Sequence, residues 1–259
     1  MKKIKLLLLL LSACIAESKA QISPPGLGLA HTADWFAVGI RQKLNRRKSW
    51  QSMSYIGIGR KSNPSDYDPV LKSAIVVLNE ELYHTINSHF QYSFALSYRR
   101  QDEYMDVSPY KHQHPGIQQE FRTYGRFYYF LPLGNRFKLA AISRQELRKF
   151  YTPAFDNPDE NFQFRSRWRI QATMSLNKQK TQKIIASSEA LLAASHKTGS
   201  NSWTPFAYEE SRFTLYYSLS LSRLPLTIDI GYMNNILGKS NPSMVHYLAL
   251  DVILESPFH

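Results

Sequence analysis

Beyond residue 33 the chain alternates between apolar and polar side chains with a period of two residues. Successive side chains of a β-strand point to opposite faces, so this alternation predicts strands whose two faces meet different environments. The clearest run starts at Phe90 and sets four aromatic residues and one leucine against Gln, Ser, Ala, Ser and Arg99. The alternation recurs in ten further segments, of which the alanine-rich 182–194 is compatible with a helix as well: 34–44, 50–60, 74–86, 117–131, 136–150, 161–176, 182–194, 211–221, 225–234 and 244–255.

The connections between these segments alternate in length. Five are short and turn-like, at 45–49, 87–88, 132–135, 177–181 and 222–225. Between them lie long stretches, many of them rich in Pro and Asp, at 61–73, 102–116, 151–160, 195–210 and 235–243. Short turns on one side and long loops on the other are typical of a meander of hairpins, above all of an outer-membrane barrel. No Gly/Ser linker divides the chain, so we expect one domain over 34–259.

Three features favour a membrane barrel over a soluble β-protein. The alternating runs are long enough for the roughly 9–11 residues of a tilted spanning strand, whereas ordinary strands average about 5–6. Their polar faces carry Arg, Gln, Ser, Thr and Tyr, while lysines collect at turns. Their apolar faces are heavily aromatic, as expected where acyl chains meet headgroups. We therefore predict an all-β fold, a transmembrane antiparallel up-and-down β-barrel, with a soluble periplasmic β-sandwich or ligand-binding barrel as the alternative.

The number of strands raises a topological problem. Eleven segments alternate, but single-chain bacterial barrels normally have an even number of strands. We expect about 12 strands, with 10 as the lower alternative. Either a strand is hidden in Leu27–Thr32, or a leader containing Pro24-Pro25-Gly26 threads the lumen. The segment 21–33 is accordingly predicted to be a leader or a hidden strand.

The N-terminus has the pattern of an export signal. Three lysines precede the apolar run Leu6–Leu11, and Ser18-Lys19-Ala20 offers small residues for signal peptidase. We predict a signal peptide over 1–20, a mature start at Gln21 and location in the outer membrane. Leu11-Ser12-Ala13-Cys14 resembles the box that directs lipid attachment in bacterial lipoproteins, so lipidation at Cys14 is the alternative.

Composition and charge exclude several classes of protein. A chain with 43% hydrophobic and 13% aromatic residues is not a disordered tail, and its longest apolar run is far too short for a spanning helix. The predicted signal carries four Lys and one Glu, so the rest of the chain keeps nine of the formal net charge of +12. Such a charge suits anionic partners. We expect outer-membrane lipid, lipopolysaccharide and an anionic solute as partners, with no nucleic acid and no cofactor.

Strand parity divides the side chains into two sets. The charged residues that it directs into the lumen are Arg99, Glu120, Arg122, Arg126, Arg144, Glu146, Arg148, Arg165, Arg167, Arg169 and Arg212. The residues that it directs toward lipid include Phe90, Tyr92, Phe94, Leu96, Phe162, Phe164, Trp168, Phe213, Leu215 and Tyr217. The inward arginines suit either an anion-selective lumen or a ladder of Arg–carboxylate pairs that fills a narrow barrel.

No residue is assigned a catalytic or metal-binding role. His84 and Ser88 flank a predicted turn, which argues against a barrel-embedded lipid-modifying hydrolase, an alternative that we nevertheless retain. His112 and His114 precede Pro115-Gly116 and are predicted to lie in a loop. The acidic residues of the presumed outer loops suit solvated charge better than Ca²⁺ bridging to lipopolysaccharide; they are Asp66, Asp68, Asp102, Glu103 and Asp106.

Several segments also carry a family resemblance. They include Pro24-Pro-Gly-Leu-Gly, Asp34-Trp-Phe-Ala-Val-Gly-Ile-Arg-Gln-Lys-Leu, Ser97-Tyr-Arg-Arg-Gln-Asp-Glu-Tyr, Arg144-Gln-Glu-Leu-Arg-Lys-Phe-Tyr, Phe164-Arg-Ser-Arg-Trp-Arg and Gly231-Tyr-Met-Asn-Asn. Together they resemble a family of Gram-negative outer-membrane proteins known only as a domain of unknown function. The resemblance implies a barrel and an outer-membrane location, but it supplies no reaction, no ligand and no residue roles. We therefore expect a non-enzymatic barrel that serves envelope structure or a narrow, anion-leaning passage.

Overall fold

The computed structural model describes residues 22–47, 49–221, 223–239 and 241–258. Within these ranges the chain forms twelve strands: β1 (Thr32–Lys43), β2 (Trp50–Lys61), β3 (Lys72–Thr85), β4 (Phe90–Tyr104), β5 (His112–Leu133), β6 (Phe137–Tyr151), β7 (Glu160–Ser175), β8 (Gln182–Lys197), β9 (Ser202–Trp203), β10 (Ala207–Ser220), β11 (Leu226–Leu237) and β12 (Ser243–Glu255). In the same ranges no helix has the length and apolar character needed to cross a membrane. The signal peptide predicted over 1–20, with Cys14, and the mature start at Gln21 lie outside the described residues.

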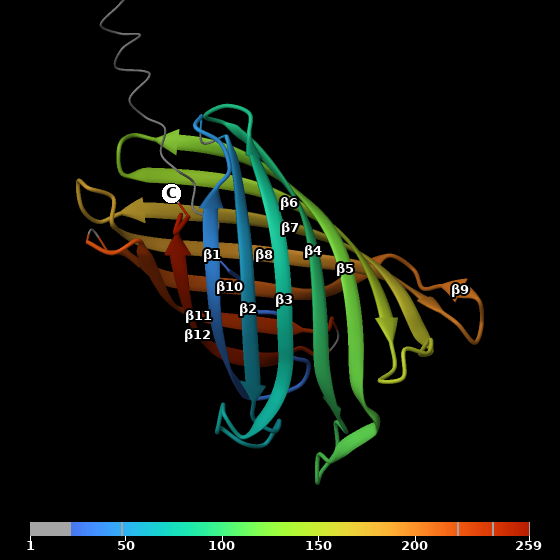
Figure 1. Cartoon of the computed structure of the whole chain (residues 1–259). Helices are drawn as coiled ribbons and strands as arrows, with labels where there is room; N and C mark the ends of the chain where they lie inside the picture. The colour runs from blue at the N-terminus through green and yellow to red at the C-terminus, as the bar shows by residue number, and fades with distance from the viewer. Residues whose placement is uncertain (1–21, 48, 222, 240, 259) are drawn as a thin grey trace, which may run out of the picture.

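Eleven strands close into a barrel (Figure 1). Each barrel strand pairs with its neighbours along the chain, and β9 lies outside the barrel, paired only with the end of β8. The predicted all-β barrel of about 12 strands is confirmed, and its eleven alternating segments are the eleven barrel strands. The segment 182–194, which was compatible with a helix, forms most of β8.

The pairing departs from the expected antiparallel pattern at one place, where β1 and β12 close the barrel in parallel. An odd number of consecutive antiparallel strands leaves the first and the last pointing the same way, so closure has to be parallel. The expectation of an even number of barrel strands, taken from typical bacterial barrels, therefore does not hold for this barrel. Arg41 and Glu255, which are opposite each other in this closing pair, form an ion pair of 2.7 Å.

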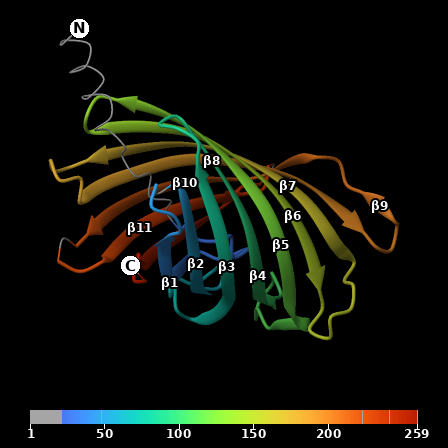
Figure 2. The same ribbon diagram turned by 45° about the horizontal axis from the view of Figure 1, so that its top comes forward.

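The short turns and the long loops lie at opposite ends of the barrel (Figures 1 and 2). In two of the short turns an asparagine side chain fixes the backbone, since Asn87 Oδ1 accepts from the Phe90 amide at 2.9 Å and Asn177 Oδ1 from the Thr181 amide at 2.9 Å. At the long-loop end β5 begins at His112, which is earlier than predicted. The prediction that His112 and His114 lie in a loop is therefore wrong, because both belong, with Pro115 and Gly116, to the exposed first residues of this strand.

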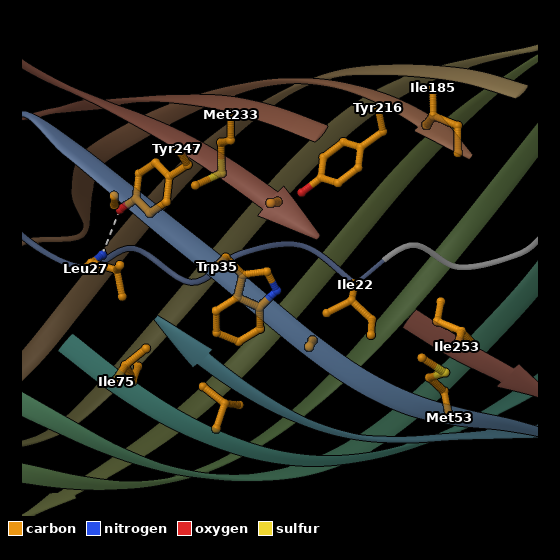
Figure 3. Close-up of a cluster of buried hydrophobic side chains, with 14 of the residues drawn as sticks. Ile22, Leu27, Trp35, Met53, Ile75, Ile185, Tyr216, Met233, Tyr247 and Ile253 are labelled. Carbon is orange, nitrogen blue, oxygen red and sulfur yellow. Dashed lines mark hydrogen bonds between the residues drawn. The ribbon is translucent and has the colours of Figure 1, made fainter. Parts of the chain in front are cut away.

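Residues 22–31, here called the leader, run through the lumen and form no strand (Figure 3). Ile22 lies near Met53 and Ile253, close to the short-turn end, and Leu27 lies near Tyr247, toward the long-loop end where β1 begins. The Leu27 amide donates to Tyr247 Oη at 3.0 Å, and Lys61 Nζ donates to the Leu27 carbonyl at 2.7 Å. Prolines 24 and 25 have no N–H for a strand ladder, so side chains of the wall hold this segment instead.

The leader packs against the inward faces of β1–β3, β11 and β12, here called the apolar wall. Leu27 and Trp35 are 1% and 2% exposed. Two glycines make room for interior rings, because a Cβ on Gly57 would lie 2.3 Å from the Trp35 ring and one on Gly231 would lie 2.3 Å from the Tyr216 ring. The inward faces of β4–β8 and β10 form the charged wall, where the predicted arginines lie.

Candidate functional site

The charged wall is built from rows of side chains that lie side by side across the strands. The register places Arg126, Arg144 and Arg167 directly opposite one another on β5, β6 and β7. The next row toward the long loops holds Tyr124, Glu146 and Arg165. Like charges directly opposite each other are destabilising. A carboxylate in the adjacent row relieves this repulsion because it reaches the arginines on the diagonal.

Glu146 is the centre of this arrangement. Its side chain has no exposed surface, and its carboxylate forms ion pairs with Arg144 Nε at 2.6 Å, Arg167 Nη1 at 3.0 Å and Arg122 Nη1 at 3.0 Å. The three arginines come from β5, β6 and β7. One carboxylate therefore ties three neighbouring strands together inside the barrel.

Four more glutamates continue the network. Glu120 pairs with Arg122 at 2.5 Å and with Arg148 at 2.7 Å, while Glu189 pairs with Arg169 at 2.6 Å and also with Arg167. Glu81, which lies on the neighbouring strand β3, is 3.4 Å from Arg126 Nε, and Glu210 on β10 is 2.5 Å from Arg212 Nη2. The Arg144 guanidinium also stacks on the Tyr124 ring, 3.6 Å from its centroid. Such stacking adds to charge pairing in a site shielded from water.

The nine predicted arginines and two predicted glutamates all turn their side chains inward on this wall. The outward set has no buried member, and its most exposed residues are Leu96 at 62%, Trp168 at 58%, Phe94 at 56% and Leu215 at 53%. Tyr92 and Phe213 are exposed as well, whereas Phe90, Phe162, Phe164 and Tyr217 are half-buried.

Sequence reasoning missed three of the five glutamates in the network. Glu189 was hidden in the alanine-rich segment whose secondary structure was ambiguous, and Glu210 precedes the segment predicted as a strand. Glu81 has the inward parity of a strand whose outward residues are Leu78 and Leu82, so parity alone indicates its position. The network therefore contains nine arginines and five glutamates, of which Glu81 belongs to β3; Glu160 and Glu209 line the lumen nearby.

A polar cavity of about 340 Å³ opens at the long-loop end of the charged wall. Four arginines of the network line it, Arg99, Arg148, Arg165 and Arg212, together with Gly26 and Gly28 of the leader. Further into the lumen two small voids of about 20 Å³ and 10 Å³ lie against the leader and the network. The lumen is thus filled below the cavity, by the leader and by the paired side chains.

The enzymatic and metal candidates are not assembled into sites. The His84 ring packs on the Trp50 ring, 4.3 Å between centroids, and within the described chain no hydrogen bond joins it to the exposed Ser88. The His112 ring packs on Tyr104, and the described residues contain no group of three or more potential ligands placed to hold a metal.

The acidic loop residues have varied surroundings. Asp66 and Asp68 each accept an amide two residues ahead, so they stabilise a turn. Asp102 and Glu103 were expected in a loop but belong to the end of β4, where Asp102 is buried and lies 3.8 Å from Arg100. Glu103 is half-buried and Asp106 is exposed.

Comparison with known proteins gives one match. No curated protein and no solved structure shows significant similarity to the chain. A family model described as "Protein of unknown function (DUF2490)" matches residues 33–245, which include all the barrel strands except the first residue of β1 and most of β12. The chain therefore belongs to the family of proteins of unknown function DUF2490.

Proposed function

We propose that this protein is exported and resides in the outer membrane as a non-enzymatic β-barrel whose lumen is sealed by its own leader and charged wall. The observation that carries the proposal is the reversal of the usual distribution of side chains. Large apolar residues such as Phe94 and Leu215 are exposed on the outer wall, while Glu146 and Arg167 are buried inside. Monomeric soluble proteins rarely expose apolar surface that continues around the molecule, whereas a membrane barrel requires it.

Aromatic residues at both ends of the outer wall support this placement. At the short-turn end the Trp50 ring lies between His84 and Tyr92, 4.3 Å and 6.4 Å away. At the long-loop end the Phe121 ring contacts Tyr98 and Tyr151, at 5.2 Å and 5.9 Å. Tyr and Trp favour the boundary between acyl chains and headgroups. In this proposal the aromatic clusters mark the two membrane boundaries, with lipids and lipopolysaccharide as the partners of the outer wall.

The filled lumen favours envelope structure over open passage. The ion pairs of Glu120, Glu146 and Glu189 are short and multiple, and the leader occupies the space beside the apolar wall. A narrow, anion-leaning passage is the second candidate, because arginines outnumber glutamates on the charged wall and rings of arginine favour negative solutes.

Electrophoresis and bilayer recording test the two levels of the proposal. A closed membrane barrel migrates faster in detergent gels before boiling than after it, and fractionates with outer membranes unless detergent is added. Fractionation of the folded protein without detergent would contradict membrane residence and favour a soluble barrel.

In planar bilayers we expect no steady conductance. Anion-selective conductance steps that become smaller in Arg165→Ala and Arg167→Ala would contradict the sealed barrel and support the narrow passage.

A further inference from the structure

The cavity at the long-loop end is where the charged wall is least neutralised. Arg148 and Arg212 have close carboxylates, Glu120 at 2.7 Å and Glu210 at 2.5 Å. The nearest described carboxylate to Arg165 is Glu210 at 3.7 Å, and Arg99 has none within 4.0 Å among the described residues. The two arginines with the weakest carboxylate pairing therefore line the same cavity, which Glu160 and Glu209 also line.

The unused hydrogen-bond donors of these two arginines also indicate that the cavity suits an anionic ligand. The Nε groups of Arg99 and Arg165 are buried and donate no hydrogen bond within the described chain, and the same holds for Arg126, Arg144 and Arg212. Of these five, only Arg99 and Arg165 have no described carboxylate closer than 3.7 Å. A buried donor without an acceptor costs about 1–3 kcal/mol, and more when it is charged. A guanidinium presents its donors as a planar fork that matches carboxylate and phosphate oxygens. Both arginines are thus suited to donate hydrogen bonds to the oxyanion of a ligand.

The leader contributes Gly26 and Gly28 to the lining of this cavity. Gly26 passes so close to Arg212 that a Cβ at this position would lie 2.8 Å from its Nη2 atom. The Arg212 Nη1 atom in turn donates to the Pro24 carbonyl at 3.3 Å. The Pro24 carbonyl and the Glu210 carboxylate therefore hold Arg212 from two sides, and Glu210 lies closer to Arg212 than to Arg165.

We propose that the cavity is a binding site for a small organic anion, held by Arg99 and Arg165 through a carboxylate or a phosphate group. The volume of about 340 Å³ admits a small solute but not a polymer segment. Glu160 also lines the cavity, and its carboxylate can accept hydroxyl groups of the ligand. The ligand enters from the long-loop end and stops at the leader. This site requires only the folded barrel, so it stands independently of the membrane proposal.

Titration calorimetry on the full chain folded in detergent tests the site, with inorganic phosphate and succinate as separate probes. We expect saturable binding of at least one probe, and the stronger of the two identifies the oxyanion that the site prefers. Arg99→Gln and Arg165→Gln should each weaken binding about tenfold or more, since each removes a charge-assisted contact. The matched control is Arg100→Gln, which removes an equal charge from an exposed, outward position on the same strand and should change the affinity less than about twofold.

Two results would overturn the inference. One is the absence of saturable binding of either probe to a chain that circular dichroism shows to be folded into β-structure. The other is an equal loss of affinity in Arg100→Gln and Arg99→Gln, which would mean that binding follows net charge alone. If Arg99→Gln does not fold, Arg99→Lys retains the charge without the planar fork, and we expect it to weaken binding; unchanged affinity in a folded Arg99→Lys variant would count against the site.

Discussion

The charged wall and the apolar wall line the same lumen, yet they are filled in different ways. On the charged wall the partners come from neighbouring strands, as when Glu146 joins arginines of β5, β6 and β7. On the apolar wall the partner is the leader, whose Leu27 side chain is 1% exposed. The first kind of filling is determined by strand register. The second depends on a segment that forms no strand at all, and the two walls should therefore respond differently to substitution.

The largest effect is expected for Glu146→Ala. The substitution leaves three guanidiniums without their shared carboxylate, and breaking a buried ion pair from one side costs about 3–5 kcal/mol. This loss of stability is measured as the change in the free energy of unfolding of the detergent-folded barrel, with unfolding in guanidinium followed by tryptophan fluorescence. Glu80→Ala is the control, because Glu80 is exposed on the outer wall and its carboxylate is hydrogen-bonded by Ser54. Equal losses in the two variants would show that the inward network adds no stability.

Leu27→Ala tests whether the leader stabilises the apolar wall. Removing a buried leucine leaves a cavity, and we expect a loss of about 2–3 kcal/mol because the leader can shift to fill part of the space. Leu29→Ala is matched to it, since Leu29 lies in the same leader but is 37% exposed. If the leader does not stabilise the apolar wall, both variants should show the same small change in the free energy of unfolding.

Gly231→Ala should cost about 1–3 kcal/mol, because the new methyl group meets the Tyr216 ring and forces one strand to move. The comparison is Gly125→Ala, where the nearest atom to a new Cβ is the Ser93 carbonyl oxygen at 3.7 Å. Chemical unfolding of both variants distinguishes tight packing of the apolar wall from a general intolerance of the barrel to alanine. A neutral Gly231→Ala would mean that this wall is loosely packed.

The smallest effect is expected for Tyr247→Phe. It removes the hydroxyl group that accepts from the Leu27 amide, and the loss of one such hydrogen bond costs about 1 kcal/mol. Because the Leu27 amide loses its acceptor, we also expect its hydrogen exchange to become faster in Tyr247→Phe. Tyr67→Phe alters a ring that is 71% exposed and should leave both quantities unchanged. Unaltered exchange at Leu27 in Tyr247→Phe would place the anchor of the leader elsewhere.

The two walls also differ in how far the sequence could predict them. Alternation of period two is a local signal, and it located all eleven barrel strands and the inward parity of arginines such as Arg144 and Arg167. The leader has no alternation to interpret, so its path was one of two open alternatives. The parallel closure is not local either, because it joins Thr32 to His246 across almost the whole chain. Pairings in the network depend on register between strands, which the alternation does not give. Glu189 and Glu210 were missed for a local reason, because one lies in a segment of ambiguous secondary structure and the other lies just before a predicted strand.

Fluorescence quenching by lipids tests the central claim, that apolar side chains face acyl chains while charges and the leader fill the lumen. Of the four tryptophans, Trp35 is 2% exposed inside the barrel and Trp168 is 58% exposed on the outer wall. One variant retains Trp35 alone and the other retains Trp35 and Trp168, each folded into vesicles with brominated acyl chains. We predict weak quenching in the first and strong additional quenching from Trp168 in the second. Strong quenching of Trp35, or none of Trp168, would contradict the account.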